Sequence, residues 1–233
     1  MAEQADLMST AEASRQLNVS ARQVQRLAAN GTIAQVGSVG RVKLLDARSI
    51  QQLKIQKTGR GRPWTQGSIE LALEWLNTGK ATSGTSVERS RTRKRLEKIT
   101  DEGLVQNMRR RAVVRRYRAS KSFLDEVAQS VTLTGTSAID ADFQLAHDFG
   151  LSGQVGRSVD GYITGKAAKQ LIRSAHLVED SNGNVTLRMT EMKALLKGRL
   201  ESLVVALDLA ESLDVRQRAA GLNFIEGKLK AFR

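Results

Sequence analysis

Apolar positions near the start of the chain recur at helical spacing and are interrupted by short polar breaks. Ser9-Thr10-Ala11-Glu12 has the spacing of a capping box and predicts a short helix that runs to Leu17. Ser20-Ala21-Arg22-Gln23 repeats this pattern and predicts a second helix, which Asn30-Gly31 ends. The apolar residues of the second helix share one face and are Ala21, Val24, Leu27 and Ala28. The pattern therefore predicts two short helices joined by a tight turn.

Two β-prone runs follow, Ile33–Val36 and Val42–Leu45, on either side of Gly37–Gly40. Such runs around a glycine-containing turn predict a hairpin. Asp46 then stands where the N-cap of a third helix is expected, and that helix carries Ile50 and Leu53. The predicted order is helix, turn, helix, hairpin, helix.

This pattern resembles the excisionase and MerR-type winged helix-turn-helix over residues 7–54. The resemblance is carried by Ser9–Ala13, Leu17–Ser20, Gln25–Leu27, Asn30-Gly31 and Gly40-Arg41. It implies that residues 1–56 form a DNA-binding domain, in which Arg and Gln at the start of the second helix contact guanine and adenine. The residues expected to contact DNA are Ser20, Arg22, Gln23, Gln25, Arg26, Arg41 and Lys43. The alternative is an ordinary helical hairpin with surface arginines.

Residues 57–66 form a basic segment rich in Gly, Arg and Pro. Its core, Arg60-Gly61-Arg62-Pro63, resembles an AT-hook, whose two arginines enter the negative potential of a narrow minor groove. Arg60 and Arg62 are therefore further candidate contacts. An interdomain linker explains the same composition equally well.

Residues 67–121 predict a second basic module of winged-helix type. Ser68 is expected to cap a largely buried helix, and Val87–Ile99 to form a second, strongly basic one. Gly103–Met108 and Ala112–Tyr117 resemble two strands of a wing, and Arg95–Ile99 with Glu102–Val105 resembles the helix-to-wing junction of bacterial winged-helix regulators. The candidate phosphate contacts are Arg89, Arg93, Lys94, Arg109, Arg110 and Arg111, the last three at the wing tip. A solvated charge run or a basic linker is the alternative.

Residues 122–233 alternate helical and strand-like patterns and predict a mixed α+β domain that binds a protein partner. The fold class expected for the whole chain is therefore α+β, with tandem winged helix-turn-helix modules before this domain. An Asn-Gly turn at 182–183 predicts a hairpin between Leu177-Val178 and Val185–Met189. The other expected elements are helices at 123–128, 137–149, 167–175, 200–213 and 215–232 and strands at 131–134 and 159–163.

The charge is divided unevenly along the chain. The 37 Lys and Arg and 24 Asp and Glu give a net charge of +13. Residues 1–121 carry +14 and residues 122–233 carry −1, which favours a polyanion partner for the first part alone.

With no Cys and two His, we expect no metal and no cofactor. No apolar run approaches the ~18 residues of a membrane span, so we expect a cytoplasmic, nucleoid-associated protein.

Two enzymatic interpretations are weak. Gly165-Lys166 follows a predicted strand as in a P-loop, but Asp160 and Ala167 break that motif. Gly135–Ser137 with Asp140 and Asp142 resembles a nucleotidyltransferase site, although a helix there would make the two carboxylates diverge. We therefore expect no catalytic residues, and a nucleotidyltransferase-like enzyme is the least favoured alternative.

The second half also resembles the carboxy-terminal domain of antitoxins of the abortive-infection type. The blocks that carry the resemblance are Val131–Ala138, Val159–Ile163, Asn184–Arg188 and Val205–Ser212, with Asp214, Arg216 and Ala220-Gly221. The resemblance implies a repressor that binds double-stranded DNA and a cognate toxin, and a homo-oligomer on DNA is compatible with it. Apart from the resemblance, the near-neutral charge of the second half favours a protein partner there, with Asp208, Glu211 and Asp214 near the closing helices as candidate contacts. The first alternative is a plasmid or phage DNA-maintenance protein, such as a replication initiator, a partition factor or an excisionase-like factor.

Overall fold

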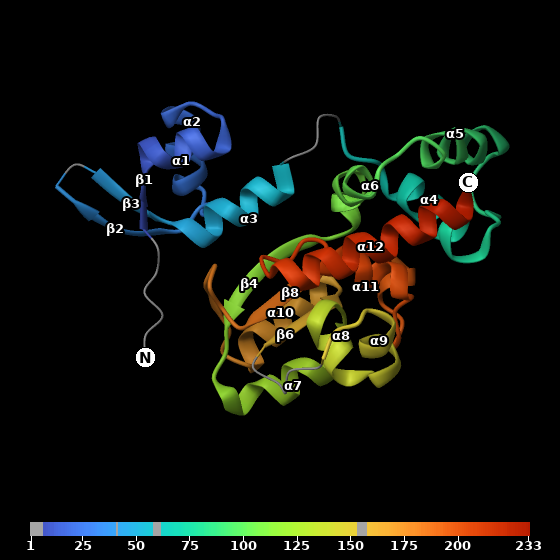
Figure 1. Cartoon of the computed structure of the whole chain (residues 1–233). Coiled ribbons are helices and arrows are strands. Elements are labelled where there is room, and N and C mark those ends of the chain that lie inside the picture. The colour runs from blue at the N-terminus through green and yellow to red at the C-terminus, as the bar shows by residue number, and fades with distance from the viewer. Residues whose placement is uncertain (1–6, 41, 58–61, 153–157) are drawn as a thin grey trace. The chain divides into compact units, whose positions relative to one another are not determined.

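The computed structural model describes residues 7–40, 42–57, 62–152 and 158–233, and it is a mixed α+β structure with two sheets (Figure 1). The chain divides into two compact units, Met1–Thr58 (unit 1) and Gly59–Arg233 (unit 2). Within the described residues, no helix combines the length and apolar character that crossing a bilayer requires.

The described residues of unit 1 form three helices and a three-stranded antiparallel sheet of order β1-β3-β2. The predicted helices and hairpin are present, whereas the first strand was not expected from the sequence. The elements are β1 (Leu7–Ser9), α1 (Thr10–Leu17), α2 (Ala21–Ala29), β2 (Gln35–Val39), β3 (Val42–Asp46) and α3 (Ala47–Lys57).

Local capping explains where the helices of unit 1 begin. Ser9 and Glu12 form the predicted reciprocal capping box, and the Ser20 hydroxyl accepts from the Gln23 amide at 3.2 Å. Asp46 likewise accepts from the first amides of α3. The helices and the sheet then share one apolar core, made of Ala13, Val24, Leu27, Ile33, Leu45, Ile50 and Leu53.

Unit 2 begins with helices and continues into a five-stranded sheet. Its first elements are α4 (Gln66–Thr78), α5 (Ser86–Leu96), α6 (Asp101–Asn107), η1 (Met108–Arg111), β4 (Val113–Arg118), η2 (Lys121–Phe123), α7 (Leu124–Gln129) and β5 (Thr132–Leu133). The remaining elements are α8 (Gly135–Ala141), α9 (Phe143–Asp148), β6 (Val159–Ile163), α10 (Gly165–Ser174), β7 (Val178–Glu179), β8 (Val185–Met189), η3 (Lys193–Leu195), α11 (Ser202–Leu209) and α12 (Val215–Phe232).

The sheet of unit 2 has the order β5-β6-β8-β4-β7. β4 pairs antiparallel with both β8 and β7, while β6 is parallel to β8. The predicted hairpin between β7 and β8 is therefore wrong, because β4 lies between these two strands. Five residues of β4 pair with β8, and this pairing buries Tyr117, Val185 and Leu187 in one apolar cluster. If β7 paired with β8 instead, β4 could not take this place and the cluster would be lost.

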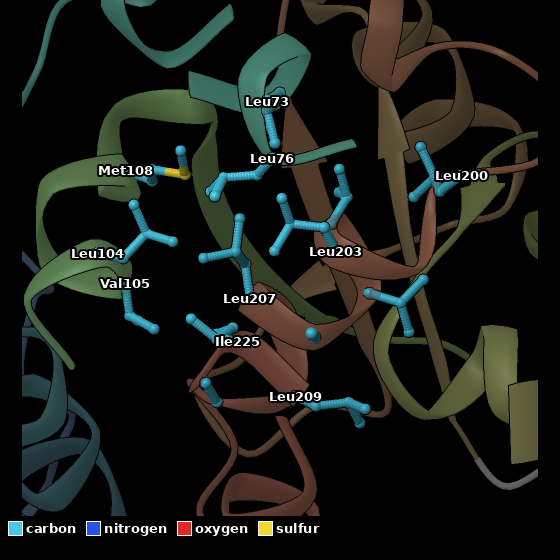
Figure 2. Packing of buried hydrophobic residues seen from close by; sticks show 14 of the residues in the cluster. Leu73, Leu76, Leu104, Val105, Met108, Leu200, Leu203, Leu207, Leu209 and Ile225 are labelled. Atoms are coloured by element: carbon cyan, nitrogen blue, oxygen red, sulfur yellow. The ribbon is translucent and has the colours of Figure 1, made fainter. Parts of the chain in front are cut away.

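The apolar core of unit 2 joins its first helices to its last ones. Figure 2 shows Leu73 and Leu76 of α4 and Leu104 of α6 packed against Leu203 and Leu207 of α11. α12 also contacts α6 and α4. The predicted division at residues 121 and 122 is therefore wrong, since both sides of it share one sheet and one core.

The predicted wing at residues 103–117 is also wrong, because its first half is helical. Thr100 caps α6 by accepting from the Gly103 amide, and Leu104 and Met108 then recur at helical spacing on the buried side. The expected helix at 137–149 is two helices, because the Asp142 carboxylate caps α9 and ends the first segment.

Candidate nucleic-acid interface

The exposed face of α2 carries three polar side chains on the side opposite the core of unit 1. Val24 and Leu27 are buried, whereas Arg22, Gln25 and Arg26 are exposed. Spacings of three and four residues place these three side chains on one face of the helix. The first turn of α2 contains no acidic residue. This face therefore offers two guanidinium groups and one amide to a ligand that can approach the helix from solvent.

The other residues predicted beside this face have different settings. Ser20 is exposed, but its hydroxyl already accepts from the backbone of Gln23, whose side chain is only half-exposed. Lys43 is exposed on β3, opposite Ser38 in the hairpin. Arg41, Arg60 and the remainder of 58–61 lie outside the described residues.

α5 has one buried edge and a basic exposed face. Thr92 and Leu96 are buried. Arg89 is half-buried and donates to the carbonyls of Ser83 and Gly84, so it holds the preceding loop. Arg93 pairs with Glu97 and lies 5.5 Å from the centre of the Trp75 ring. Lys94, the third residue of α5 predicted as a contact, is exposed.

Sequence reasoning missed part of this face. Arg91, Lys94, Arg95 and Lys98 follow one another at intervals of three, one and three residues, and all four are exposed. This spacing gives a single basic stripe, which helical periodicity could have revealed.

Arg109, Arg110 and Arg111 do not form a wing tip. They lie in η1, where Arg110 is exposed and Arg109 is half-buried. Arg111 is 2% exposed and donates to the Tyr162 hydroxyl at 2.9 Å and to Asp208 and Glu211. The prediction that Arg111 contacts DNA is therefore wrong, because its charge is already matched by carboxylates inside the protein.

A buried charge cluster surrounds Arg111. Arg188 of β8 makes two hydrogen bonds to Asp160 of β6, at 2.7 and 2.9 Å, and also pairs with Asp208 and Glu211. Burial by itself raises the pKa of Asp208, but Arg188 and Arg111 beside it lower that pKa below its ordinary value. The cluster therefore holds Asp208 as an anion and joins β6, β8 and η1 to α11.

This cluster corrects the predicted partner contacts. Asp208 is 3% exposed and Glu211 pairs with both buried arginines, so neither carboxylate is presented to another protein. Asp214 is exposed, but it caps α12 by accepting from the amides of Arg216 and Gln217.

The two carboxylates of the nucleotidyltransferase alternative have different settings. Asp142 caps α9 and pairs with Arg199 at 2.7 Å, while Asp140 is exposed at the end of α8. Within the described ranges, no group of three or more His, Cys, Asp or Glu is placed to hold a metal ion.

Arg62 is exposed and belongs to unit 2. The Trp64 amide beyond it donates to the carbonyl of Asn107 at 2.9 Å, which ties this segment to the end of α6. Arg62 lies next to the basic end of α5, and both line one concave surface region, the basin described below.

Comparison with known proteins finds no matching family model, no matching curated protein and no matching solved structure.

Proposed function

We propose that this chain binds double-stranded DNA and that unit 1 acts as a winged helix-turn-helix whose α2 reads base edges. The observation that carries the proposal is the exposed face of α2, where Arg22, Gln25 and Arg26 project away from the core. Arginine pairs in a bidentate manner with guanine and glutamine with adenine, and the major groove admits a helix of this kind.

The remainder of unit 1 supports the same interpretation. Two helices joined by a tight turn precede an antiparallel hairpin, and Lys43 on that hairpin is exposed. A lysine on a wing can contact a phosphate while the helix occupies the groove. The net charge of +13 adds a general attraction to polyanions.

The proposal is tested on the full chain with a duplex selected from a randomised pool and a scrambled duplex of the same length. Arg22→Ala and Arg26→Ala should each weaken binding to the selected duplex by about 1–3 kcal/mol and relax preference at one position. Arg15→Ala is the matched control, because Arg15 is exposed on α1 and outside the α2 face. Equal losses on both duplexes would contradict base reading by α2.

We also propose that the protein is a transcriptional repressor of its own operon and the antitoxin of a cognate toxin. What supports a protein partner for unit 2 is its exposed apolar side chains, above all Phe143, which is 86% exposed. Co-purification of unit 2 with the product of the neighbouring gene, and its loss in Phe143→Ser, tests this role. A replication origin with iterated repeats beside the gene would favour the DNA-maintenance alternative.

A further inference from the structure

A basic basin lies on unit 2, between the amino-terminal end of α4 and the carboxy-terminal end of α5. Its volume is about 870 Å³. Four cationic residues line it, Arg62 before α4 and Lys94, Arg95 and Lys98 at the end of α5. All four are exposed, and no carboxylate is found among the described residues of the lining. The basin therefore combines a concave shape with a concentrated positive charge.

Hydrogen-bond donors complete one wall of the basin. Thr65 caps α4, and its hydroxyl lies 3.1 Å from that of Ser68. Both hydroxyls line the basin, together with Asn107. α4 is 13 residues long, and its N-cap Thr65 lines the basin, so the positive end of its helix dipole lies at this wall. Cations with hydroxyl and amide donors are the groups that bind phosphate oxygens.

The basin is built beside residues that are packed into the main core of unit 2. The Trp64 amide donates to Asn107, and Trp64 is 7% exposed in the main core of unit 2. Leu96 of α5 is fully buried in the same core. The Arg233 guanidinium donates to the carbonyl of Ile99 at 2.6 Å, so the end of the chain holds the loop that carries Lys98. Lys94, Arg95 and Lys98 therefore lie beside anchored residues of the core, and Arg62 lies two residues before the anchored Trp64.

We propose that this basin binds phosphate groups of the duplex DNA backbone and is a second, sequence-independent contact of the protein. The proposal rests on the proposed DNA binding, to which it adds a site and a class of ligand group. Duplex backbone is favoured over a free nucleotide because the exposed stripe continues from the basin to Arg91, one turn earlier on α5, which suits a row of phosphates. We therefore expect this contact to be independent of the base sequence.

The test replaces the four cations in the full chain by Arg62→Gln, Lys94→Gln, Arg95→Gln and Lys98→Gln. Binding to the selected and the scrambled duplex is measured by fluorescence anisotropy between about 50 and 200 mM salt. We expect both affinities to fall roughly tenfold or more and the dependence of log K on log salt to become shallower by about 2 to 4. The ratio of the two affinities should stay unchanged, since that ratio reports on unit 1.

The matched control removes the same charge elsewhere on unit 2, by Lys169→Gln, Arg173→Gln, Lys193→Gln and Arg216→Gln. These residues are exposed and do not line the basin. If both quadruple variants flatten the salt dependence equally, the effect belongs to net charge and the proposed basin contact is overturned. Circular dichroism checks that each variant is folded, and the double variant Lys94→Gln and Lys98→Gln should give about half of the change.

A second measurement needs no DNA and separates the two proposals. Inorganic pyrophosphate is titrated into the full chain while the indole resonance of Trp64 and the amide resonance of Ser68 are followed by NMR. Saturable shifts that the basin variant loses and the control variant keeps support the basin even if α2 proves not to read bases. Absence of these shifts, or their presence with an unchanged DNA salt dependence, overturns the proposal.

Discussion

Arg111 and Asp208 lie 97 positions apart in the chain and form an ion pair from which solvent is excluded, with side-chain exposures of 2% and 0%. Asp208 also accepts hydrogen bonds from Tyr162 and Thr134. The pair therefore joins the segment that leads into β4 to the buried helix α11. It also explains why an arginine in a strongly basic run faces inward.

Removing one partner of this pair should destabilise unit 2 strongly. Asp208→Ala leaves Arg111 and Arg188 buried with less compensating charge, and breaking a buried pair from one side costs about 3–5 kcal/mol. Urea unfolding followed by circular dichroism measures the loss. Arg115→Ala is the control, because its pair with Glu179 is exposed and should contribute no more than about 1 kcal/mol. Similar losses in the two variants would show that the buried cluster has no special role.

The crossing of α11 and α12 depends on Gly221. A Cβ atom there would lie 2.5 Å from the Ala206 carbonyl and 2.6 Å from the Ala210 amide, both on the backbone of the neighbouring segment. Gly221→Ala should therefore force the helices apart and cost about 1–3 kcal/mol. Gly227 on the same helix has no atom within 4 Å of its Cβ position, so Gly227→Ala should be neutral or stabilise by up to about 1 kcal/mol. Thermal unfolding of both variants compares them directly, and equal effects would contradict the close approach.

The two tyrosines of the chain should resist ionisation while the protein is folded. Burial raises the pKa of Tyr162 well above its ordinary value of 10.0, and burial also raises the pKa of Tyr117. A raised folded pKa means that the unfolded state loses its proton first. The stabilisation is therefore complete below pH ~10 and is lost as the pH rises further. The tyrosinate absorbance of Tyr162, half of the total, should appear only together with unfolding; ionisation of both tyrosines near pH 10 in folded protein would contradict the burial of Tyr162.

Elements determined by neighbouring residues could be predicted from the sequence. Ser9 with Glu12, and Ser20 with Gln23, lie within one turn of each other, so the starts of α1 and α2 were correctly predicted. The exposed α2 face followed from the same local periodicity. This is why Arg22, Gln25 and Arg26 are found where the pattern placed them.

Elements determined by distant residues could not be predicted in the same way. Gly103–Met108 is apolar enough for a strand, and packing against α12 adds to the Thr100 cap in favouring the helix α6. β7 pairs with β4 rather than with β8, although β8 is closer in sequence. In the sequence, Arg111 cannot be told from its exposed neighbour Arg110. Its acidic partners, Asp208 and Glu211, lie about 100 residues later in the chain, in α11 and just after it.

The position of the domain boundary gives the last prediction. A cut near Thr58 separates the two compact units, whereas a cut after Lys121 removes β4 from between β8 and β7 and strips α4 and α6 from the core beside α11 and α12. We therefore expect fragments 1–58 and 59–233 to unfold cooperatively on their own. Fragments 1–121 and 122–233 should behave differently, because the second would expose the apolar side chains that α4 and α6 now cover.

Thermal unfolding and limited proteolysis of the four fragments measure this difference. Unfolding is measured because DNA binding alone would mislead. Residues 1–121 carry a net charge of +14, so this fragment would bind DNA through charge even if its second half were unfolded. DNA binding by that fragment is therefore no sign of a domain, and cooperative unfolding is the measurement that decides. A fragment 122–233 that unfolds cooperatively would show that the sheet forms without β4, and it would restore a boundary at residue 121.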